Sequence, residues 1–177
     1  MTFAYAPALS QAAAVAADHA LATDGGAFPT AALAALRAGG LLGLVSSTDV
    51  GGHGLGLGAA VEVVETLARA CASTAMVTCM HYAGAVVIEA HGPRAVREAI
   101  AAGRHLTTLA FSEAGSRSQF WVPVSTATPD GDHVRLNAKK SWVTSARHAD
   151  SYVWSSKPAA GTELSTLWLV PRTAAGL

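Results

Sequence analysis

Charged residues are scarce in this chain. Of its 177 residues only 14% are charged, and 12 basic side chains balance 12 acidic ones to a formal net charge of zero. The basic residues form no run or stripe, which excludes the usual electrostatic signature of nucleic-acid binding, so we expect no nucleic-acid partner. Hydrophobic residues make up 51% of the chain, which is ample for a core and leaves few charges for the surface. We therefore expect another protein surface to cover part of it.

Cysteines and long hydrophobic runs are also few. Cys71 and Cys79 lie eight residues apart in sequence of helical character, too far along the axis for a disulfide, so two buried thiols in a cytoplasmic protein are expected. The most apolar stretch, residues 74–90, contains a histidine and a glutamate and is short for a membrane span, so it predicts a buried helix and no membrane partner. The first basic residue is Arg37, which argues against a signal peptide.

The first hundred or so residues have helical patterns, with Ala, Leu and Glu dominating as far as Gly103. In one predicted helix, residues 57–70, Val61, Val64 and Leu67 would form the apolar stripe. Another would be capped by Ser73 or Thr74. The predicted helices cover residues 7–22, 29–38, 57–70, from about 74 to the Gly92-Pro93 pair, and from Pro93 to near Gly103.

Strand patterns follow Gly103, where Thr, Ser, Val and Trp become frequent. A turn is expected at residues 129–132 (PDGD). The predicted strands are residues 107–111, 122–128, 133–136, 142–144, 151–155 and 166–170. This change predicts an α+β fold with a helical domain over residues 1–104 and a β domain over residues 105–177.

A glycine-rich stretch, residues 51–59 (GGHGLGLGA), fits the loose pattern of a dinucleotide-binding loop. That loop requires a parallel strand ending in an acidic residue about twenty residues further on. Here the chain at that distance has a helical pattern and no acid. We prefer to interpret the stretch as a turn between two helices.

Two short segments carry the strongest functional signal: residues 109–113 (LAFSE) and 140–144 (KSWVT). Together with residues 39–54, 65–73 and 169–177, and in this order, they resemble the N-terminal and middle domains of the acyl-CoA dehydrogenase family. The resemblance spans nearly the whole chain. It implies an N-terminal all-α helical bundle followed by an incomplete antiparallel β-barrel-like domain, with the family's C-terminal four-helix domain absent.

The resemblance also implies an FAD cofactor. A flavin ring requires hydrogen bonds at its pyrimidine edge and N5, and an apolar or aromatic wall against its face. By resemblance the first segment lies along the pyrimidine side, Trp142 flanks the ring, and Thr144 bonds near N5. The alternative is that Trp142 is a core aromatic and Thr144 an ordinary strand hydroxyl. The implied cofactor contacts are Leu109, Phe111, Ser112, Ser118, Trp142, Val143 and Thr144.

An acyl thioester is the implied substrate, with Ser118 and His81 as candidate contacts. His81 lies in a helix resembling one that lines the family's acyl pocket, and a satisfied core histidine is the alternative. The family's catalytic base is a glutamate of the C-terminal domain, so no catalytic residue is assigned here. We interpret Glu89 as a helix cap or part of a buried pair, and the resemblance gives Glu113 a structural place. The seven histidines lack metal-ligand spacing, so no metal is expected.

The chain departs from the family after Glu113, where the usual pattern is PGxGSD. Residues 114–119 are AGSRSQ, with Arg117 in place of a glycine, and the bulky pair Phe120 and Trp121 follows. Such a change would alter the acyl-CoA site more than the flavin site. It keeps a flavin-dependent monooxygenase of the same superfamily open as an alternative.

The function implied by the resemblance is flavin-dependent α,β-dehydrogenation of an acyl thioester, by the N-terminal portion or subunit of a larger cytoplasmic enzyme. A second polypeptide would supply the C-terminal helical domain, in a homo- or hetero-oligomer, because a truncated β domain leaves an unpaired strand edge. A further alternative, from a different class, is a non-catalytic subunit that stabilises a partner dehydrogenase.

Overall fold

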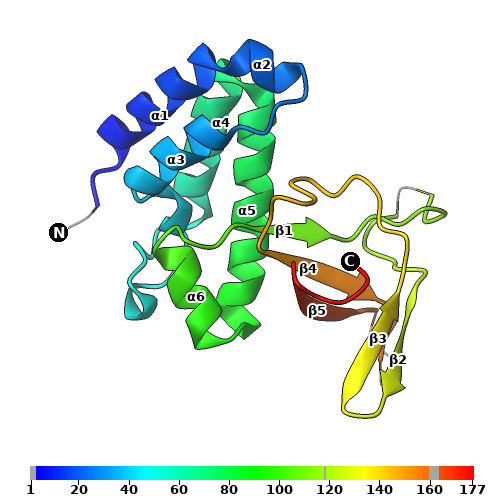
Figure 1. Ribbon diagram of the computed structural model, residues 1–177. Coiled ribbons are helices and arrows are strands. Elements are labelled where there is room, and N and C mark those ends of the chain that lie inside the picture. The colour runs from blue at the N-terminus through cyan, green and yellow to red at the C-terminus, as the bar shows by residue number, and fades with distance from the viewer. Residues whose placement is uncertain (1–2, 118, 160–163) are drawn as a thin grey trace.

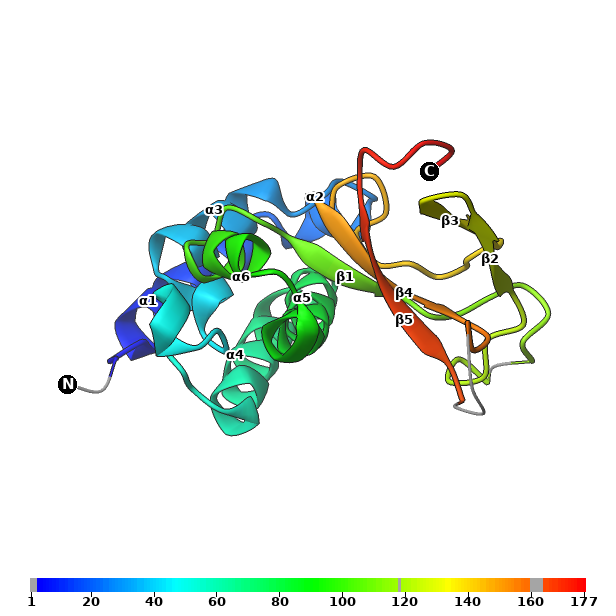
Figure 2. The same ribbon diagram turned by 90° about the horizontal axis from the view of Figure 1, so that it is seen from below.

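The helices come first in the chain and the strands follow, as the composition predicts (Figure 1). The computed structural model describes residues 3–117, 119–159 and 164–177. The long helix α5 lies between the other helices and a small sheet (Figures 1 and 2). The helical elements are α1 (Ala6–Asp18), α2 (Ala20–Asp24), α3 (Thr30–Ala38), the 3-10 turns η1 (Leu41–Gly43) and η2 (Thr48–Val50), α4 (Leu57–Ala70), α5 (Ala72–His91) and α6 (Arg94–Ala101).

The helical core forms where α1, α3, α4 and α5 meet. In α4 the residues Ala60, Val63 and Leu67 are buried at helical spacing, whereas Val61 is 63% exposed. The predicted bounds of α4 are therefore confirmed, but its buried face is rotated from the predicted one. Burial of such a stripe stabilises a helix more than its intrinsic propensity does.

Two helix ends differ from the prediction. The helix expected over residues 7–22 is broken at His19, whose ring nitrogen lies 3.0 Å from the carbonyl oxygen of Val15. In a continuous helix that carbonyl would accept the backbone N–H of His19, so the histidine ring competes with the helical backbone hydrogen bond. Helix α5 begins at Ala72 after the extended residue Cys71, without the side-chain cap expected from Ser73 or Thr74.

The sheet has the strand order β1 (Thr107–Ala110), β4 (Ser151–Ser156) and β5 (Thr166–Pro171). Strands β1 and β4 are parallel and β4 and β5 antiparallel, so the sheet is mixed and forms no closed barrel among the described residues. Its inner face packs on α5, where a methyl group on Gly84 would lie 2.9 Å from Cγ2 of Thr107. A glycine there lets helix and strand approach closely.

A separate hairpin of β2 (Thr126–Asp130) and β3 (His133–Asn137) projects from the sheet end of the molecule (Figure 1). Its turn is shorter than expected, because Pro129 belongs to β2 and only Gly131 and Asp132 connect the strands. Strand β2 also begins later than predicted. The backbone N–H groups of Val124 and Ser125 donate to the Glu113 carboxylate instead of to a neighbouring strand.

Residues 51–56 of the glycine-rich stretch form a turn between η2 and α4, as the preferred interpretation predicts, and residues 57–59 begin α4. Gly51 and Gly54 have left-handed φ values of 87° and 61°. Both cysteines are free thiols, Cys71 buried and Cys79 half-buried. Among the described residues, no helix combines the length and apolar character needed to cross a membrane, and no cluster of three or more His, Cys, Asp or Glu is suited to a metal.

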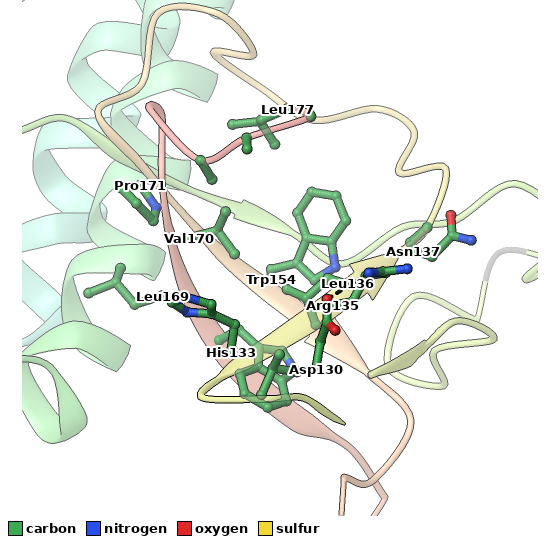
Figure 3. Close-up of a pocket in the computed structure, with 16 residues that line it drawn as sticks. Asp130, His133, Arg135, Leu136, Asn137, Trp154, Leu169, Val170, Pro171 and Leu177 are labelled. Atoms are coloured by element: carbon green, nitrogen blue, oxygen red, sulfur yellow. Dashed lines mark hydrogen bonds and ion pairs between the residues drawn. The ribbon is translucent and has the colours of Figure 1, made fainter. Parts of the chain in front are cut away.

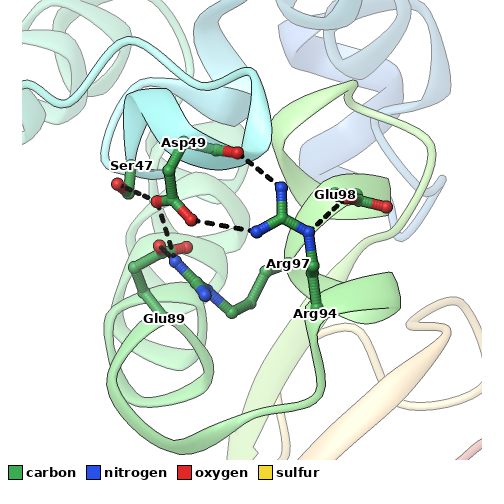
Figure 4. A network of polar contacts seen from close by, with 6 residues as sticks. All are labelled: Ser47, Asp49, Glu89, Arg94, Arg97 and Glu98. Atoms are coloured by element: carbon green, nitrogen blue, oxygen red, sulfur yellow. Dashed lines mark hydrogen bonds and ion pairs between the residues drawn. The ribbon is translucent and has the colours of Figure 1, made fainter.

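A network of ion pairs fastens η2 and α6 to α5 (Figure 4). Arg97 of α6 pairs with Glu89 of α5 and, at 3.1 Å, with Asp49 of η2. Arg94 pairs with Asp49 at 3.3 Å and with Glu98 at 2.8 Å. Glu89 is thus in a partly buried pair, one of the two structural roles expected for it.

Candidate functional site

The two signal segments lie side by side. The backbone N–H of Ser141 donates to the carbonyl oxygen of Ser112 at 2.9 Å, and the next pair, Glu113 and Lys140, forms an antiparallel bridge. Two segments about thirty residues apart in the sequence need not be in contact in the fold. The fold brings the end of β1 to the start of the segment 141–150, which we call the Trp142 loop.

Trp142 projects outward from this loop. Its side chain is 93% exposed and its φ is +56°, so the strand predicted for residues 142–144 is wrong. Ser145 and Arg147 also have positive φ, at 62° and 70°. Three such non-glycine residues in one short loop cost about 1 kcal/mol each and reverse the chain direction instead of extending it. The exposure also rules out the alternative that Trp142 is a core aromatic.

Contacts on the inner side hold the Trp142 loop in place. Val143 packs on a small cluster that contains Ala110 and Tyr152, and the Tyr152 hydroxyl accepts the backbone N–H of Arg147 at 3.1 Å. Thr144 is half-buried. The hydroxyl oxygen of Ser145 is buried and has no hydrogen-bond partner among the described residues.

The remaining predicted cofactor residues lie in different surroundings. Leu109 and Phe111 pack against the α5 side of the sheet with Ile88 and Val153, so only their backbone is available to a ligand at the strand end. Ser112 is half-buried and lies two residues beyond the end of β1. Ser118, predicted for both cofactor and substrate, lies outside the described residues.

His81 lies in the core between α5, η1 and β1, with no exposed surface. Its Nε2 donates to the carbonyl oxygen of Leu42 at 3.0 Å, and its Nδ1 accepts the N–H of Thr107 at 3.2 Å. Burial lowers the pKa of His81 from 6.5 to about 4, so the ring is neutral. These contacts match the alternative of a satisfied core histidine.

A buried ion pair next to the site was missed from the sequence. Nζ of Lys140 lies 2.6 Å from Oε1 of Glu113, and the two side chains are 3% and 2% exposed. Burial opposes ionisation of Glu113, but hydrogen bonds from Lys140, Ser125 and Val124 outweigh it and hold the carboxyl pKa below its usual value. The only hint in the sequence is that Lys140 stands just before an apolar segment, and that arrangement is too common to predict a buried lysine.

A second histidine contact resembles a catalytic pair but cannot act as one. Nε2 of His105 lies 2.7 Å from the hydroxyl oxygen of Ser151. Ser151 is only 2% exposed, and its hydroxyl donates to Oγ1 of Thr107 at 3.1 Å. No substrate reaches that oxygen, so the pair supports the sheet.

A groove of about 590 Å³ separates the hairpin from β4 and β5 (Figure 3). Trp154, Trp168 and Val170 line its sheet side, and Leu136 and His133 line its hairpin side. Trp142 and Ser112 are not among its lining residues. Neither of these two residues therefore faces the groove.

The chemistry at the Trp142 loop fits a flavin. A flat tricyclic ring requires an aromatic or apolar wall, which the free faces of the Trp142 indole provide. It also requires hydrogen-bonding groups along one edge, and the half-buried Ser112 and Thr144 supply two hydroxyl-bearing residues in the two signal segments. The donor set and the exposed aromatic are thus those that such a cofactor needs.

Solved structures share this fold. An acyl-CoA dehydrogenase from Geobacillus kaustophilus superposes with a TM-score of 0.74 at 23% identity, covering 86% of this chain and 42% of its own. Methanesulfinate monooxygenase from Pseudomonas fluorescens gives 0.75 at 21% identity, covering 95% and 44%. Similarity at these identities shows the fold alone, and the same fold occurs in proteins named for two different reactions.

Sequence similarity is more specific. Glutaryl-CoA dehydrogenase of Desulfococcus multivorans is 29% identical over 148 residues, which cover 78% of this chain and 38% of that protein. The chain therefore spans less than half the length of the relatives it matches. Residues 8–103 match the family model described as acyl-CoA dehydrogenase, N-terminal domain. This match covers more than half of the chain, and the chain belongs to the acyl-CoA dehydrogenase family.

Proposed function

We propose that this chain is the N-terminal, flavin-binding portion or subunit of an FAD-dependent oxidoreductase that dehydrogenates an acyl thioester between its α and β carbons. Family membership supports the reaction class. The pairing of the Ser112 and Ser141 backbones supports the position of the cofactor, since it joins the two segments predicted to hold it.

One observation carries the proposal: a tryptophan that is 93% exposed stands on a left-handed backbone beside Ser112. Holding a large aromatic side chain in solvent on a strained residue is unfavourable in the isolated chain. The arrangement is favourable when a flat ligand covers the indole. We therefore assign Trp142 to the wall of the flavin site, with Thr144 and Ser112 as hydrogen-bonding groups.

Bound FAD would supply the acceptor for the hydride lost from the substrate. The residues of this chain bind and orient the ring and exclude water from one of its faces. The described acids near the site are already engaged, because Glu113 pairs with Lys140 and Asp150 accepts the backbone N–H of Leu106 and pairs with Arg172. We therefore propose that the proton acceptor comes from a C-terminal helical domain supplied by another part of the protein or a second polypeptide, in a homo- or hetero-oligomer.

Substitution of Trp142 tests the proposal. Trp142→Gly removes the wall and also relieves the left-handed backbone, so the protein stays folded while FAD retention falls. Trp142→Phe keeps an aromatic face and retains most of the FAD. The exposed side chain Leu21 on α2, 88% exposed, provides the control Leu21→Ala, which leaves FAD binding unchanged. The measurement is the visible flavin band of the protein purified with any chain that accompanies it. Equal FAD content in Trp142→Gly and wild type contradicts the proposed site.

A monooxygenase is the second candidate, favoured by Arg117 in place of the family glycine and by the exposed pair Phe120 and Trp121, 50% and 56% exposed. Anaerobic reduction of the flavin by an acyl-CoA supports the dehydrogenase. Reaction of the reduced flavin with oxygen and a second substrate supports the monooxygenase. A non-catalytic subunit is the third candidate, and activity unchanged by Trp142→Gly supports it.

A further inference from the structure

The buried pair of Lys140 and Glu113 joins four segments around the candidate site. Nζ of Lys140 donates to Glu113 at 2.6 Å, to the carbonyl oxygen of Ser155 at 2.7 Å and to that of Phe111 at 3.3 Å. The Glu113 carboxylate accepts the backbone N–H groups of Val124 and Ser125 at 2.9 and 2.8 Å. The end of β1, the residue directly before the Trp142 loop, the end of β4 and the approach to β2 therefore meet at one ion pair.

The position of the pair in the chain is informative. Glu113 directly follows Ser112, and Lys140 precedes Trp142 by two residues. Each charged residue is thus attached through a short, paired stretch of backbone to one half of the proposed flavin site. Any displacement of one partner moves the hydroxyl of Ser112 relative to the indole of Trp142.

Stability alone does not require charges at this place. Buried ion pairs lose much of their attraction to desolvation, and apolar replacements of similar volume are often equally stable. Hydrogen bonds differ from apolar contacts in being directional. The Lys140 ammonium is aimed at acceptors from two segments, the end of β1 and the end of β4, and it also lies 5.2 Å from the ring centre of Trp154. Such a set of contacts fixes the relative position of the segments that it joins, whereas an apolar pair would allow them to shift.

We propose that Lys140 and Glu113 are positioning residues for the cofactor: their ion pair sets the spacing between Ser112 and Trp142 and so sets the affinity for flavin. The inference rests on the proposed function and adds residues to it that do not touch the ring. A misplacement of about 1 Å at such a site is enough to lower function about a hundredfold.

The test compares FAD affinity and fold in the protein with its natural partner chain, if one accompanies it. The double variant Lys140→Met with Glu113→Gln removes both charges at nearly constant volume. We expect normal helical circular dichroism, FAD affinity reduced at least about tenfold, and an altered visible circular dichroism of the remaining bound flavin. The matched control is Arg97→Met with Glu89→Gln, which removes a partly buried ion pair of the helical part. Its FAD affinity stays at the wild-type value.

The outcomes separate the inference from the proposed function. A folded double variant that binds FAD with wild-type affinity and spectrum overturns the inference only. A wild-type protein that takes up no FAD overturns the proposed function and the inference with it. If the double variant does not fold, Ser155→Ala serves instead, since it removes one hydroxyl 3.1 Å from Nζ. It is expected to weaken FAD binding about fivefold, and unchanged binding counts against the inference.

Discussion

The ring of Phe28 stacks on the ring of His148, with 3.8 Å between the ring centres and 4° between the planes. Phe28 lies in the connection between α2 and α3, and His148 lies near the end of the Trp142 loop. The helical part of the molecule therefore contacts the loop that carries the candidate flavin wall. The contact fastens the loop at the end opposite to Ser141.

Loss of this stack should loosen the loop. We expect Phe28→Ala and His148→Ala each to lower the free energy of unfolding, with a coupling energy between them of about 1 kcal/mol, because aromatic pairs contribute that much beyond their buried area. Urea unfolding of the two single variants and the double variant measures it. Faster hydrogen exchange at the backbone amides of Ala146 and Ala149 should accompany the loss. Additive effects of the two substitutions contradict the coupling.

The buried His81 should make the protein sensitive to mild acid. Its pKa is lowered by burial to about 4, whereas the unfolded chain binds a proton near pH 6.5. Between these values the unfolded state holds more protons, so the free energy of unfolding falls by about 1.4 kcal/mol per pH unit as pH decreases from 6.5 towards 4. Urea unfolding at several pH values in this window measures the slope.

A variant without the titrating ring isolates this effect. His81→Gln keeps a donor for the Leu42 carbonyl and should give a flatter pH profile at the cost of lower stability at neutral pH. Burial also lowers the pKa of His105, so the comparison is made in a His105→Asn background. An unchanged slope in His81→Gln assigns the acid sensitivity to other groups.

Two glycines should respond to alanine in opposite directions. A methyl group on Gly84 would lie 2.9 Å from Cγ2 of Thr107, which is buried in β1, so Gly84→Ala should destabilise the protein by about 1–3 kcal/mol. Gly58, in the first turn of α4, has no neighbouring atom within 4 Å of its potential methyl group. Gly58→Ala should stabilise by about 0.5–1 kcal/mol. Unfolding midpoints that shift in the same direction contradict the close contact between α5 and β1.

Because the backbone at Arg147 is left-handed, glycine should be more stabilising than alanine at this position, the reverse of the order in a helix. With φ of 70° at this residue, Arg147→Gly should be more stable than Arg147→Ala by about 1 kcal/mol. The backbone N–H that donates to Tyr152 is present in both variants. At Ala95, an exposed position of α6, glycine should instead be the less stable residue by a similar amount. Thermal unfolding of the four proteins measures both differences.

Local sequence patterns predicted where helices and strands lie better than they predicted which face of each is buried. The bounds Leu57–Ala70 of α4 match the prediction, because helical spacing of apolar residues is a property of the segment itself. The segment contains apolar residues on more than one face, and contact with α1 and α5 decides that Val63 and not Val61 is buried. Similarly, β2 begins late because a carboxylate from elsewhere in the chain takes two backbone donors.

The resemblance assigns both signal segments to one flavin ring, and the structure places them side by side but gives the second a loop in place of the predicted strand. The backbones of Ser112 and Ser141 form the contact between them. The segment at Trp142 has the composition of a strand, yet the chain reverses there, because it must leave the bridge at Lys140 and enter β4 parallel to β1. The Lys140 and Glu113 pair escaped prediction because burial of a charge depends on the groups that surround it.

The amino-acid sequence by itself determined the order of helices and strands and the family to which the chain belongs, since periodicity and motif spacing are carried by neighbouring residues. Tertiary structure alone decided that the side chain of Trp142 is exposed to solvent and that of Lys140 is buried. Those outcomes depend on which distant segments meet in space, and on whether the polar groups brought together satisfy one another there.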